Sequence, residues 1–326
     1  MVLFIIRRVL FVIPIMLGVT LIIFALRVIT PGDPLDQIMP SATTTEEQRD
    51  AMRAQLGLDQ PIPIQFVRYV KGVFTGDFGK SYQTRQPITD TLLVRLPVSL
   101  LISCGSVILG LLIGIPLGVI SSNRQYSWVD SVVLFFSTIA NATPGFVLAL
   151  TMIAVFSVKL GWLPAVGITN PLGYIMPMVT IAVSTSSQYT RITRSSMLEV
   201  IRQDYIRTAR AKGQAKITIT MRHSLRNALI PVAAAAGSQL NIQLGGAFII
   251  ETVFGVPGIG KYIADSIAVR DFPVIQGGVI LLAFVLTIMN LIIDLSFIVI
   301  NPRLKTSVIS GRTRMRKTLL KTAAID

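Results

Sequence analysis

The chain has 326 residues, of which 52% are hydrophobic and only 14% are charged, and its formal net charge is +14. A soluble globular domain carries about 25% charged residues, so this composition excludes that class and indicates a membrane protein. The positive charge lacks the interleaved aromatic residues of a nucleic-acid binder, so we expect no nucleic acid. One Cys (Cys104) and one His (His223) are too few for a disulfide framework, a zinc site or a Cys/His nucleophile pair, so we expect no catalytic residue and no metal site.

A helix needs about twenty apolar residues to cross the hydrocarbon core of a membrane. The first such segment is longer than the core of a signal sequence and ends in RVITPGDP, so we expect a retained span. The third is long and contains Pro144, which predicts a kink or a tilt. The fourth, which ends in STSSQYTR, is the weakest. The sequence therefore predicts an all-α polytopic membrane protein with six spans, at 9–29, 98–120, 131–158, 171–190, 229–250 and 277–300.

The distribution of Lys and Arg predicts the orientation of these spans. If the N-terminus is cytoplasmic, the inside segments carry 19 Lys and Arg residues and the outside segments carry 10. Acidic residues have the opposite distribution, with four inside and eleven outside. We therefore expect both termini in the cytoplasm. The inside segments are then 1–8, 121–130, 191–228 and 301–326.

The outer segment 30–97 is long enough to fold. Its stretch DQPIPIQFVRYVKGVF has apolar residues at helical spacing, which predicts a helix that either lies near the membrane plane or packs on the spans. We expect four parts in the chain: a first span (1–29), an extracytoplasmic region (30–97), a core membrane domain (98–306) and a basic cytoplasmic tail (307–326).

A short stretch of the outer segment resembles part of a nucleotide site. GDFGKS at 76–81 ends like a phosphate-binding loop, but Phe74 stands where that motif needs Gly. We expect no nucleotide site in this chain.

Small residues recur at every fourth position of the second span, at Ser106, Gly110, Gly114 and Gly118. This pattern permits close contact between helices, which is a main way for helices to associate in lipid. Asp294 is the only acid inside a span, and we expect it to be a cap or an ion-pair partner rather than a proton relay.

Uncharged polar residues also lie within the spans. Gln239 and Gln243 are one turn apart in the fifth span, and Asn141, Ser184 and Gln188 in the third and fourth spans can pair with them. Such residues either line a water-filled translocation path or hydrogen-bond helices to one another. Both interpretations stay open from the sequence.

Residues 191–228 form the longest cytoplasmic connection, and their pattern is helical. Apolar residues recur at helical spacing, and polar residues form a stripe on the opposite side of the helix. KITIT alternates like a strand, but the apolar residues around it keep a four-residue spacing, which favours helix. Gly213 separates two helical pieces and can turn the chain. Such a structured loop suggests docking on a cytoplasmic partner, with lipid headgroups as the alternative. The apolar positions are Leu198, Ile201, Tyr205, Ala209, Ile217, Met221 and Leu225, and the polar stripe is Gln203, Arg207, Arg210 and Gln214.

MLEVIRQDYIRTARAKG followed by RHSLRNALIPV resembles the cytoplasmic coupling loop in permease subunits of dipeptide and oligopeptide ABC importers. The likeness covers nearly all of residues 1–305 and is to the first, B-type inner-membrane component of the two permeases that such systems pair. The further blocks that agree, in order, are TPGDP (30–34), LGLDQP (56–61), GDFGKS (76–81), ETVFGVPGIGKYIADSIAVRDFPVIQGG (251–278) and NLIIDLSFIVINPR (290–303).

The resemblance implies a type I ABC importer permease fold in a bacterial inner membrane. An extracytoplasmic binding protein then delivers substrate to a pair of homologous permeases, and two ATPase subunits bind ATP and Mg and supply the energy. The chain itself would be no enzyme and would hold no cofactor. The family's Glu-Ala-Ala, three residues, Gly pattern is matched cleanly only at Gly213. By resemblance, the helix seated in the ATPase groove contains Asp204, Tyr205, Arg207, Ala209, Arg210 and Gly213.

The substrate and two other classes of protein stay open. Relatives of this type carry dipeptides, oligopeptides, glutathione, or nickel and other metal chelates, and we expect di- or oligopeptides. A stand-alone secondary transporter is the alternative class, but residues 1–150 and 151–300 show no convincing inverted repeat. An integral membrane enzyme would need a His cluster, paired acids or a metal set.

Overall fold

The computed structural model describes residues 2–31, 35 and 45–300, and most of these residues are helical. The helices are, in chain order, α1 (Val2–Ile29), α2 (Glu46–Leu56), α3 (Ile62–Thr75), α4 (Ile88–Asn123), α5 (Trp128–Ala142), α6 (Gly145–Met152), the π-helix η2 (Ile153–Lys159), the 3-10 helix η3 (Pro171–Tyr174), α7 (Ile175–Ile201), α8 (Asp204–Ala211), α9 (Lys216–Thr218), the π-helix η4 (Ile219–Leu225), α10 (Arg226–Gly246), α11 (Phe248–Val253), α12 (Ile259–Ala268) and α13 (Phe272–Ile300). The basic tail expected at 307–326 lies outside the described residues.

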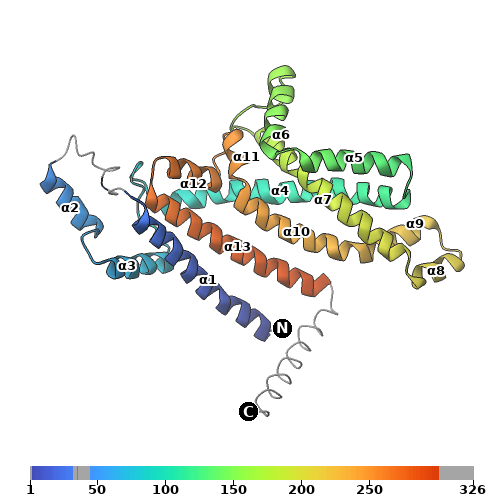
Figure 1. The fold of residues 1–326 in the computed structure, drawn as a ribbon, viewed down its shortest axis with the longest axis horizontal. Coiled ribbons are helices and arrows are strands. Elements are labelled where there is room, and N and C mark those ends of the chain that lie inside the picture. The colour runs from blue at the N-terminus through green and yellow to red at the C-terminus, as the bar shows by residue number, and fades with distance from the viewer. Residues whose placement is uncertain (1, 32–34, 36–44, 301–326) are drawn as a thin grey trace, which may run out of the picture.

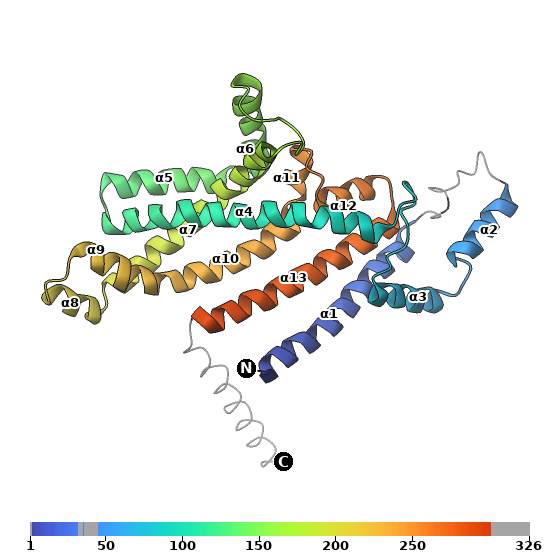
Figure 2. The ribbon, with the colours of Figure 1, turned by 180° about the vertical axis from the view of Figure 1, so that it is seen from behind.

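A bundle of long helices forms the centre of the molecule. Helices α4, α5, α7 and α10 run alongside one another, and α13 and then α1 follow on one side (Figures 1 and 2). The short helices α8 and α9 lie at one end of the bundle, where α4 is joined to α5, and α12 lies at the end where α4 begins (Figure 1). Segments far apart in the sequence are therefore brought together at each end.

Three helices of the described chain are long and apolar enough to cross a membrane: Leu10–Ile29, Ile88–Asn123 and Phe272–Ser296. A fourth candidate is the bent pair formed by α5 with α6 and η2. Helices α7 and α10 form at the predicted fourth and fifth spans but are less apolar, since α7 carries many Ser and Thr residues on its buried face. The count of six spans therefore stays a prediction.

The predicted third span is broken at Pro144. Helix α5 ends at Ala142, α6 begins at Gly145, and the two axes differ by 100°. Thr143 is extended, with φ −76° and ψ 121°, because the ring of a following proline disfavours the helical conformation. The kink expected at Pro144 is confirmed, but residues 131–158 form separate helices rather than one kinked or tilted rod.

Helices α4 and α7 form a very close contact along the glycine stripe of α4. A Cβ atom at Gly114 would lie 2.6 Å from the carbonyl oxygen of Ser186 and 2.7 Å from Cβ of Tyr189. Gly110 and Gly118 face α7 in the same way. The close approach predicted from the spacing of small residues is therefore confirmed, and α7 is the helix that fills it.

The buried face of α7 is made largely of hydroxyl side chains. Thr180, Thr185, Ser186 and Thr190 donate hydrogen bonds to carbonyl oxygens three or four residues earlier in α7 itself. Such local bonds satisfy the hydroxyl groups without a partner on another helix. These four side chains are short and bond within their own helix, which suits close packing on glycines.

At the end of the bundle where α4 begins, a buried carboxylate holds α11, α12 and α4 together. Glu251 is 1% exposed, and it accepts hydrogen bonds from the hydroxyl of Ser99 at 2.6 Å and from the backbone N–H of Lys261 at 2.8 Å. The Ser99 oxygen in turn accepts from the N–H of Ile259 at 2.9 Å. The N–H groups of Ile259 and Lys261, in the first turn of α12, thereby have partners. A carboxylate is also favoured at a helix N-terminus by the helix dipole. A Cβ at Gly258 would lie 2.2 Å from the carboxylate carbon of Glu251, so only glycine fits there.

The GDFGKS segment is held by a second buried carboxylate. Asp271, 2% exposed, accepts hydrogen bonds from the Ser81 hydroxyl at 2.6 Å and from the N–H groups of Tyr82 at 3.1 Å and Gln83 at 3.3 Å. An antiparallel bridge between Lys80 and Pro87 closes the loop. The segment therefore serves to attach the loop before α4 to the turn between α12 and α13.

Helix α3 packs on the first helix. The ring of Phe24 lies 5.2 Å from the ring of Phe66 and 5.9 Å from the ring of Tyr69, and Arg27 donates to Gln65 at 2.5 Å. Burial raises the pKa of the Tyr69 phenol. Packing on the chain's own spans is thus the interpretation of this helix that the contacts favour. Ile62, Ile64, Val67 and Phe74 of this helix are exposed.

We predict that Gly114→Ala destabilises the bundle. The added methyl group must displace the α7 backbone at Ser186, and overpacking of this kind costs about 1–3 kcal/mol. The measurement is thermal unfolding of the purified chain in detergent. Gly18→Ala on α1 is the matched control, because its Cβ meets no atom within 4 Å and alanine favours a helix. A Gly114→Ala protein as stable as the Gly18→Ala protein would contradict the close contact.

Candidate functional site

The connection between α7 and α10 is a helical hairpin of residues 204–225, called here the α8–η4 hairpin. Helix α7 ends at Ile201 and α8 begins at Asp204. Gly213 then turns the chain with φ +75°, a left-handed conformation that suits glycine. After the turn, α9, η4 and α10 follow one another without a break. The predicted sequence of helix, turn at Gly213 and second helix is confirmed, and the second helix leads into α10.

A small apolar cluster joins the two legs of the hairpin. Ile206 is fully buried, and it packs with Ala209 and Ile219 across the turn. Of the apolar positions that the sequence stripe contains in α8, Ala209 is buried, whereas Tyr205 is 45% exposed. The break after Ile201 resets the rotation of α8, so the helical spacing that begins in α7 does not continue through it.

The second leg is helical, as the four-residue spacing of its apolar residues predicts. Two of those residues, Ile217 and Met221, are 68% and 51% exposed, whereas Ile219 is buried. Residues 219–225 form a π-helix, in which each turn holds more residues than an α-turn. A four-residue spacing therefore does not follow the buried side of this segment.

Hydrogen bonds add to the apolar attachment. Asn227 at the start of α10 donates to the Tyr205 hydroxyl at 3.0 Å and to the carbonyl oxygen of His223 at 2.9 Å. The Nε2 atom of His223 lies 2.9 Å from Oε1 of Gln214 at the turn. Each leg is thus tied to the other along its length, so the hairpin is suited to move as one body.

The outward face of the hairpin is cationic and open. Arg207 and Asp204 are 3.8 Å apart, with side chains 75% and 98% exposed, and such an exposed pair contributes little stability. Of the six residues assigned by resemblance to the ATPase-binding helix, Ala209 is buried inside the hairpin and the others are exposed: Asp204, Tyr205, Arg207, Arg210 and Gly213.

The residues expected along the translocation path are brought together only in part. Gln239 of α10 donates a hydrogen bond to Oε1 of Gln188 on α7. Gln243 and Ser184 are half-buried, and Asn141, next to the bend after α5, is exposed. Asn241, which lies between Gln239 and Gln243 in the sequence, donates a hydrogen bond to Asn290 of α13 at 2.8 Å. In the isolated chain, Gln188 and Gln239 therefore connect helices to one another.

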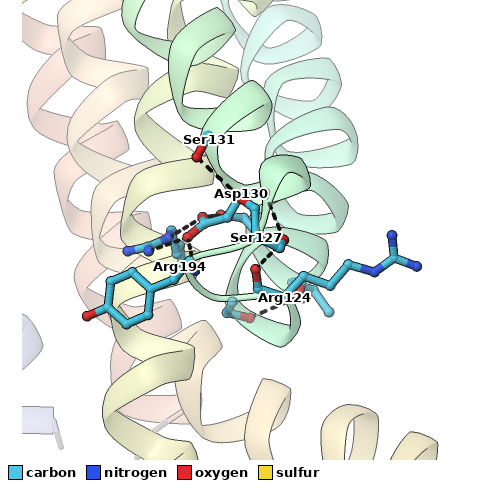
Figure 3. A network of polar contacts seen from close by, with 9 residues as sticks. Arg124, Ser127, Asp130, Ser131 and Arg194 are labelled. Carbon is cyan, nitrogen blue, oxygen red and sulfur yellow. Dashed lines mark hydrogen bonds and ion pairs between the residues drawn. The ribbon is translucent and has the colours of Figure 1, made fainter.

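An ion pair that the sequence did not reveal joins α5 to α7. The guanidinium of Arg194 donates two hydrogen bonds to Asp130, from Nε to Oδ1 at 2.8 Å and from Nη2 to Oδ2 at 2.7 Å. Asp130 is 3% exposed and also accepts from the Ser121 hydroxyl and from the N–H of Tyr126 at 3.0 Å. Figure 3 shows the two charged side chains pointing toward each other beside the turn of Arg124 and Ser127. We call these contacts the Asp130–Arg194 clamp.

One half of this clamp has a local sequence signal. The Ser127 side chain accepts from the N–H of Asp130, which is the pattern of an N-cap three residues before an acid. Nothing local indicates that Arg194, 64 residues later, is the partner.

The chain matches two family descriptions over most of its length. Residues 114–306 match the family described as binding-protein-dependent transport system inner membrane component, and residues 1–103 match the N-terminal region described for the same kind of membrane component. Among similar proteins, a glutathione transport system permease protein GsiC of Salmonella paratyphi A is 36% identical over 93% of this chain and 98% of its own length. The protein of the same name from Escherichia coli strain K12 is 35% identical with the same coverage.

Solved structures with the same fold are chains of ABC transporters. An inward-facing structure of the MetNI methionine ABC transporter has a TM-score of 0.57 at 20% identity, covering 64% of this chain and 96% of that one. A crystal structure of an amino acid ABC transporter has a TM-score of 0.50 at 17% identity, covering 66% and 94%. At these identities the likeness shows the fold alone. The family match over residues 114–306 and this shared fold agree, and the chain therefore belongs to the inner-membrane permease components of binding-protein-dependent ABC importers.

Proposed function

We propose that this chain and a second homologous permease form the path through which an ABC importer carries short peptides, with glutathione, a tripeptide, in this substrate class. An external binding protein delivers the substrate, and two ATPase subunits that bind ATP and Mg drive the transport. The relatives named as glutathione permeases, at 35–36% identity over 93% of the chain, support a peptide-like substrate. Other di- and oligopeptides and metal chelates are alternatives that the transport assay below distinguishes.

The observation that carries this proposal is the α8–η4 hairpin. It is a compact cationic body placed directly between α7 and α10, with an internal cluster of Ile206, Ala209 and Ile219. A rigid helix seated in a partner's cleft moves with that cleft when it closes. Because the hairpin continues into both long helices, its displacement would tilt α7 and α10 together. ATP binding by the partner would thus be converted into alternating access of the path.

The proposal includes six spans with both termini in the cytoplasm. The 19 Lys and Arg residues of the inside segments, against 10 outside, support this orientation. Helices α7 and α10 are less apolar than the candidate spans, and each packs against several other helices; the polar residues of a span face such neighbours or a water-filled path rather than lipid. The α8–η4 hairpin is then cytoplasmic, and the loop held by Asp271 is extracytoplasmic.

The path itself is proposed to run along α7 and α10. Gln188, Gln239 and Gln243 lie on these two helices, with Ser184 one turn before Gln188 and Asn141 beside the bend after α5. Uncharged amides can bond peptide groups of many sequences, because they both donate and accept. In the inward-open and outward-open states, the bond between Gln188 and Gln239 would be exchanged for bonds with substrate or water.

The function is tested with the complete complex in proteoliposomes. The chain, its second permease and its ATPase subunits are co-purified, and ATP-dependent uptake of labelled glutathione, a labelled dipeptide and nickel is measured with the binding protein. We expect uptake of a peptide that requires ATP. Uptake by the lone chain driven by an ion gradient would overturn the proposal, and uptake of nickel alone would overturn its substrate class.

We predict that Ile206→Ala loosens α8. Truncation of a fully buried isoleucine removes the main contact between the two legs and costs about 2–5 kcal/mol locally. Hydrogen exchange of residues 204–211 should be faster, and uptake per ATP should fall. Ile217→Ala is the control, since this side chain is 68% exposed. Equal exchange in the two variants would show that the cluster does not stiffen the hairpin.

We predict that Arg207→Glu uncouples ATP hydrolysis from uptake. The substitution puts a second carboxylate beside Asp204 and reverses the charge that α8 presents to the ATPase at the proposed interface. We expect uptake per ATP to fall by about tenfold or more. The control is Arg53→Glu on α2, because Arg53 and Asp50 form the same kind of pair, three residues and 3.8 Å apart. Normal peptide-stimulated transport by the Arg207→Glu complex would refute this role of α8.

We predict that Gly213→Pro also uncouples the complex while the long helices stay inserted. Proline fixes φ near −65° and cannot adopt the +75° of this turn, so the two legs separate. Gly213→Asn is the matched control, because asparagine tolerates the left-handed conformation. Uptake and ATPase activity are measured for both; a Gly213→Pro complex that transports like Gly213→Asn would contradict the prediction.

A further inference from the structure

Helix α5 has few buried side chains to attach it to the bundle. Of its fifteen residues, only Asp130 and Ser137 are buried. Several of its large apolar side chains are exposed in the chain alone: Trp128, Val132, Phe135, Phe136 and Ile139. In lipid, the hydrophobic effect does not press such a helix onto its neighbours, so specific contacts decide where α5 lies.

Beyond the clamp, the packing between α5 and its neighbours is incomplete. A cavity of about 270 Å³ lies between α4, α5 and α7, lined by Leu117, Val133, Phe136, Ser187 and Thr190 among others. The Ser187 hydroxyl has no hydrogen-bond partner, although its residue is 2% exposed. A helix beside a cavity has fewer van der Waals contacts to resist its displacement. The middle of α5 is therefore held less firmly than its first turn.

The two ends of α5 differ in freedom. At its last turn, Thr143 and Pro144 break the helix, and the chain bends by 100° into α6. At its first turn, the carboxylate of Asp130 accepts four hydrogen bonds, two of them from Arg194. Paired N–H donors of a guanidinium fix both the distance and the orientation of a carboxylate. Helix α5 is thus a rod with a bend at one end and a rigid polar attachment at the other.

The attachment lies close to the α8–η4 hairpin along one continuous helix. Arg194 is on α7, which runs unbroken to Ile201, and α8 begins at Asp204. Seven residues of α-helix span about 10 Å, so a displacement of the hairpin reaches Arg194 through a short stiff rod. The turn between α4 and α5 lies at the same end of the bundle as α8 and α9 (Figure 2).

From these contacts we infer that the Asp130–Arg194 clamp is the linkage through which α7 carries α5 when the α8–η4 hairpin moves. Asp130 and Arg194 are positioning residues for transport: they touch no substrate, and they make the first turn of α5 follow α7 while the bend at Pro144 absorbs the change of angle. This role rests on the proposed function, because the force on the hairpin comes from the ATPase partner. The moving unit is then α5 together with α7 and α10, rather than α7 and α10 alone.

The experiment compares variants of the clamp in the reconstituted complex. Asp130→Asn and Arg194→Gln each break the pair, and the double variant Asp130→Asn/Arg194→Gln removes both charges without leaving a buried ion unpaired, so it keeps the fold where a single variant fails. Arg194→Lys retains the charge but loses the paired donors. Asp50→Asn on α2, an exposed carboxylate, is the control for loss of an acid.

Two readouts separate a linkage from a purely structural pair. Uptake per ATP should fall about tenfold or more in the single and double variants while ATP hydrolysis continues, with Arg194→Lys in between. Spin labels at the exposed positions Ser131 and Ser195, in a Cys104→Ser background, report the distance between α5 and α7. We expect one narrow distance with and without ATP in the wild type, and a broad or nucleotide-dependent distance in the double variant.

A double variant with wild-type uptake per ATP, or with an unchanged narrow distance, would overturn the inference. The spin-label measurement is also made on the purified chain without partners, where broadening in the double variant requires no ATPase. If the wild-type chain neither binds ATPase subunits nor transports with ATP, the proposed function fails, whereas the label distances in the chain alone still decide whether the clamp holds α5 to α7.

Discussion

Helix α7 lies against α4 at a separation that only glycine at Gly114 allows, and the positions of several other elements depend on that contact. Lipid is as apolar as the side chains of a span, so close van der Waals contact has to supply what the hydrophobic effect supplies in water. Several hydroxyl groups on the buried face of α7 bond within α7 itself, which lets the two helices approach without a hydrogen-bond partner on α4 for those groups. A well-fixed α7 can then transmit movement along its length.

The elements attached to α7 differ in how firmly they are held. The α8–η4 hairpin is joined to it by the chain and stiffened by Ile206 and by the hydrogen bonds of Asn227. Helix α5 is joined mainly through Asp130 at its first turn. At the other end of the bundle, Glu251 and Asp271 fix α11, α12 and the loop before α4 by backbone N–H groups. Rigid attachments thus lie at both ends, and the less densely packed region lies between α5 and α7.

Features that depend on local spacing were predictable from the sequence, and features that depend on distant partners were not. The glycine stripe, the bend at Pro144 and the turn at Gly213 each follow from the conformational preferences of the residue itself. The buried positions of the hairpin, such as Ile206 and Ile219, do not follow the apolar stripe of the sequence, because a two-residue break and a π-helix change the rotation of the chain. Asp130 and Arg194 are 64 residues apart, and many Arg and Lys residues of the sequence are equally plausible partners for Asp130.

The loop held by Asp271 has a consequence for the detection of nucleotide-binding proteins by short motifs. Successive backbone N–H groups and a serine hydroxyl make a concave anion site whatever the anion is. In this chain the bound anion is the carboxylate of Asp271, which lies 190 residues after Ser81. A search for Gly-Lys-Ser would report a nucleotide-binding loop here, although the anion that this loop binds is the Asp271 carboxylate of the same chain. Of the tripeptide only the Ser81 hydroxyl binds this carboxylate, and the two N–H groups belong to Tyr82 and Gln83 beyond it, so the tripeptide alone does not identify a nucleotide site.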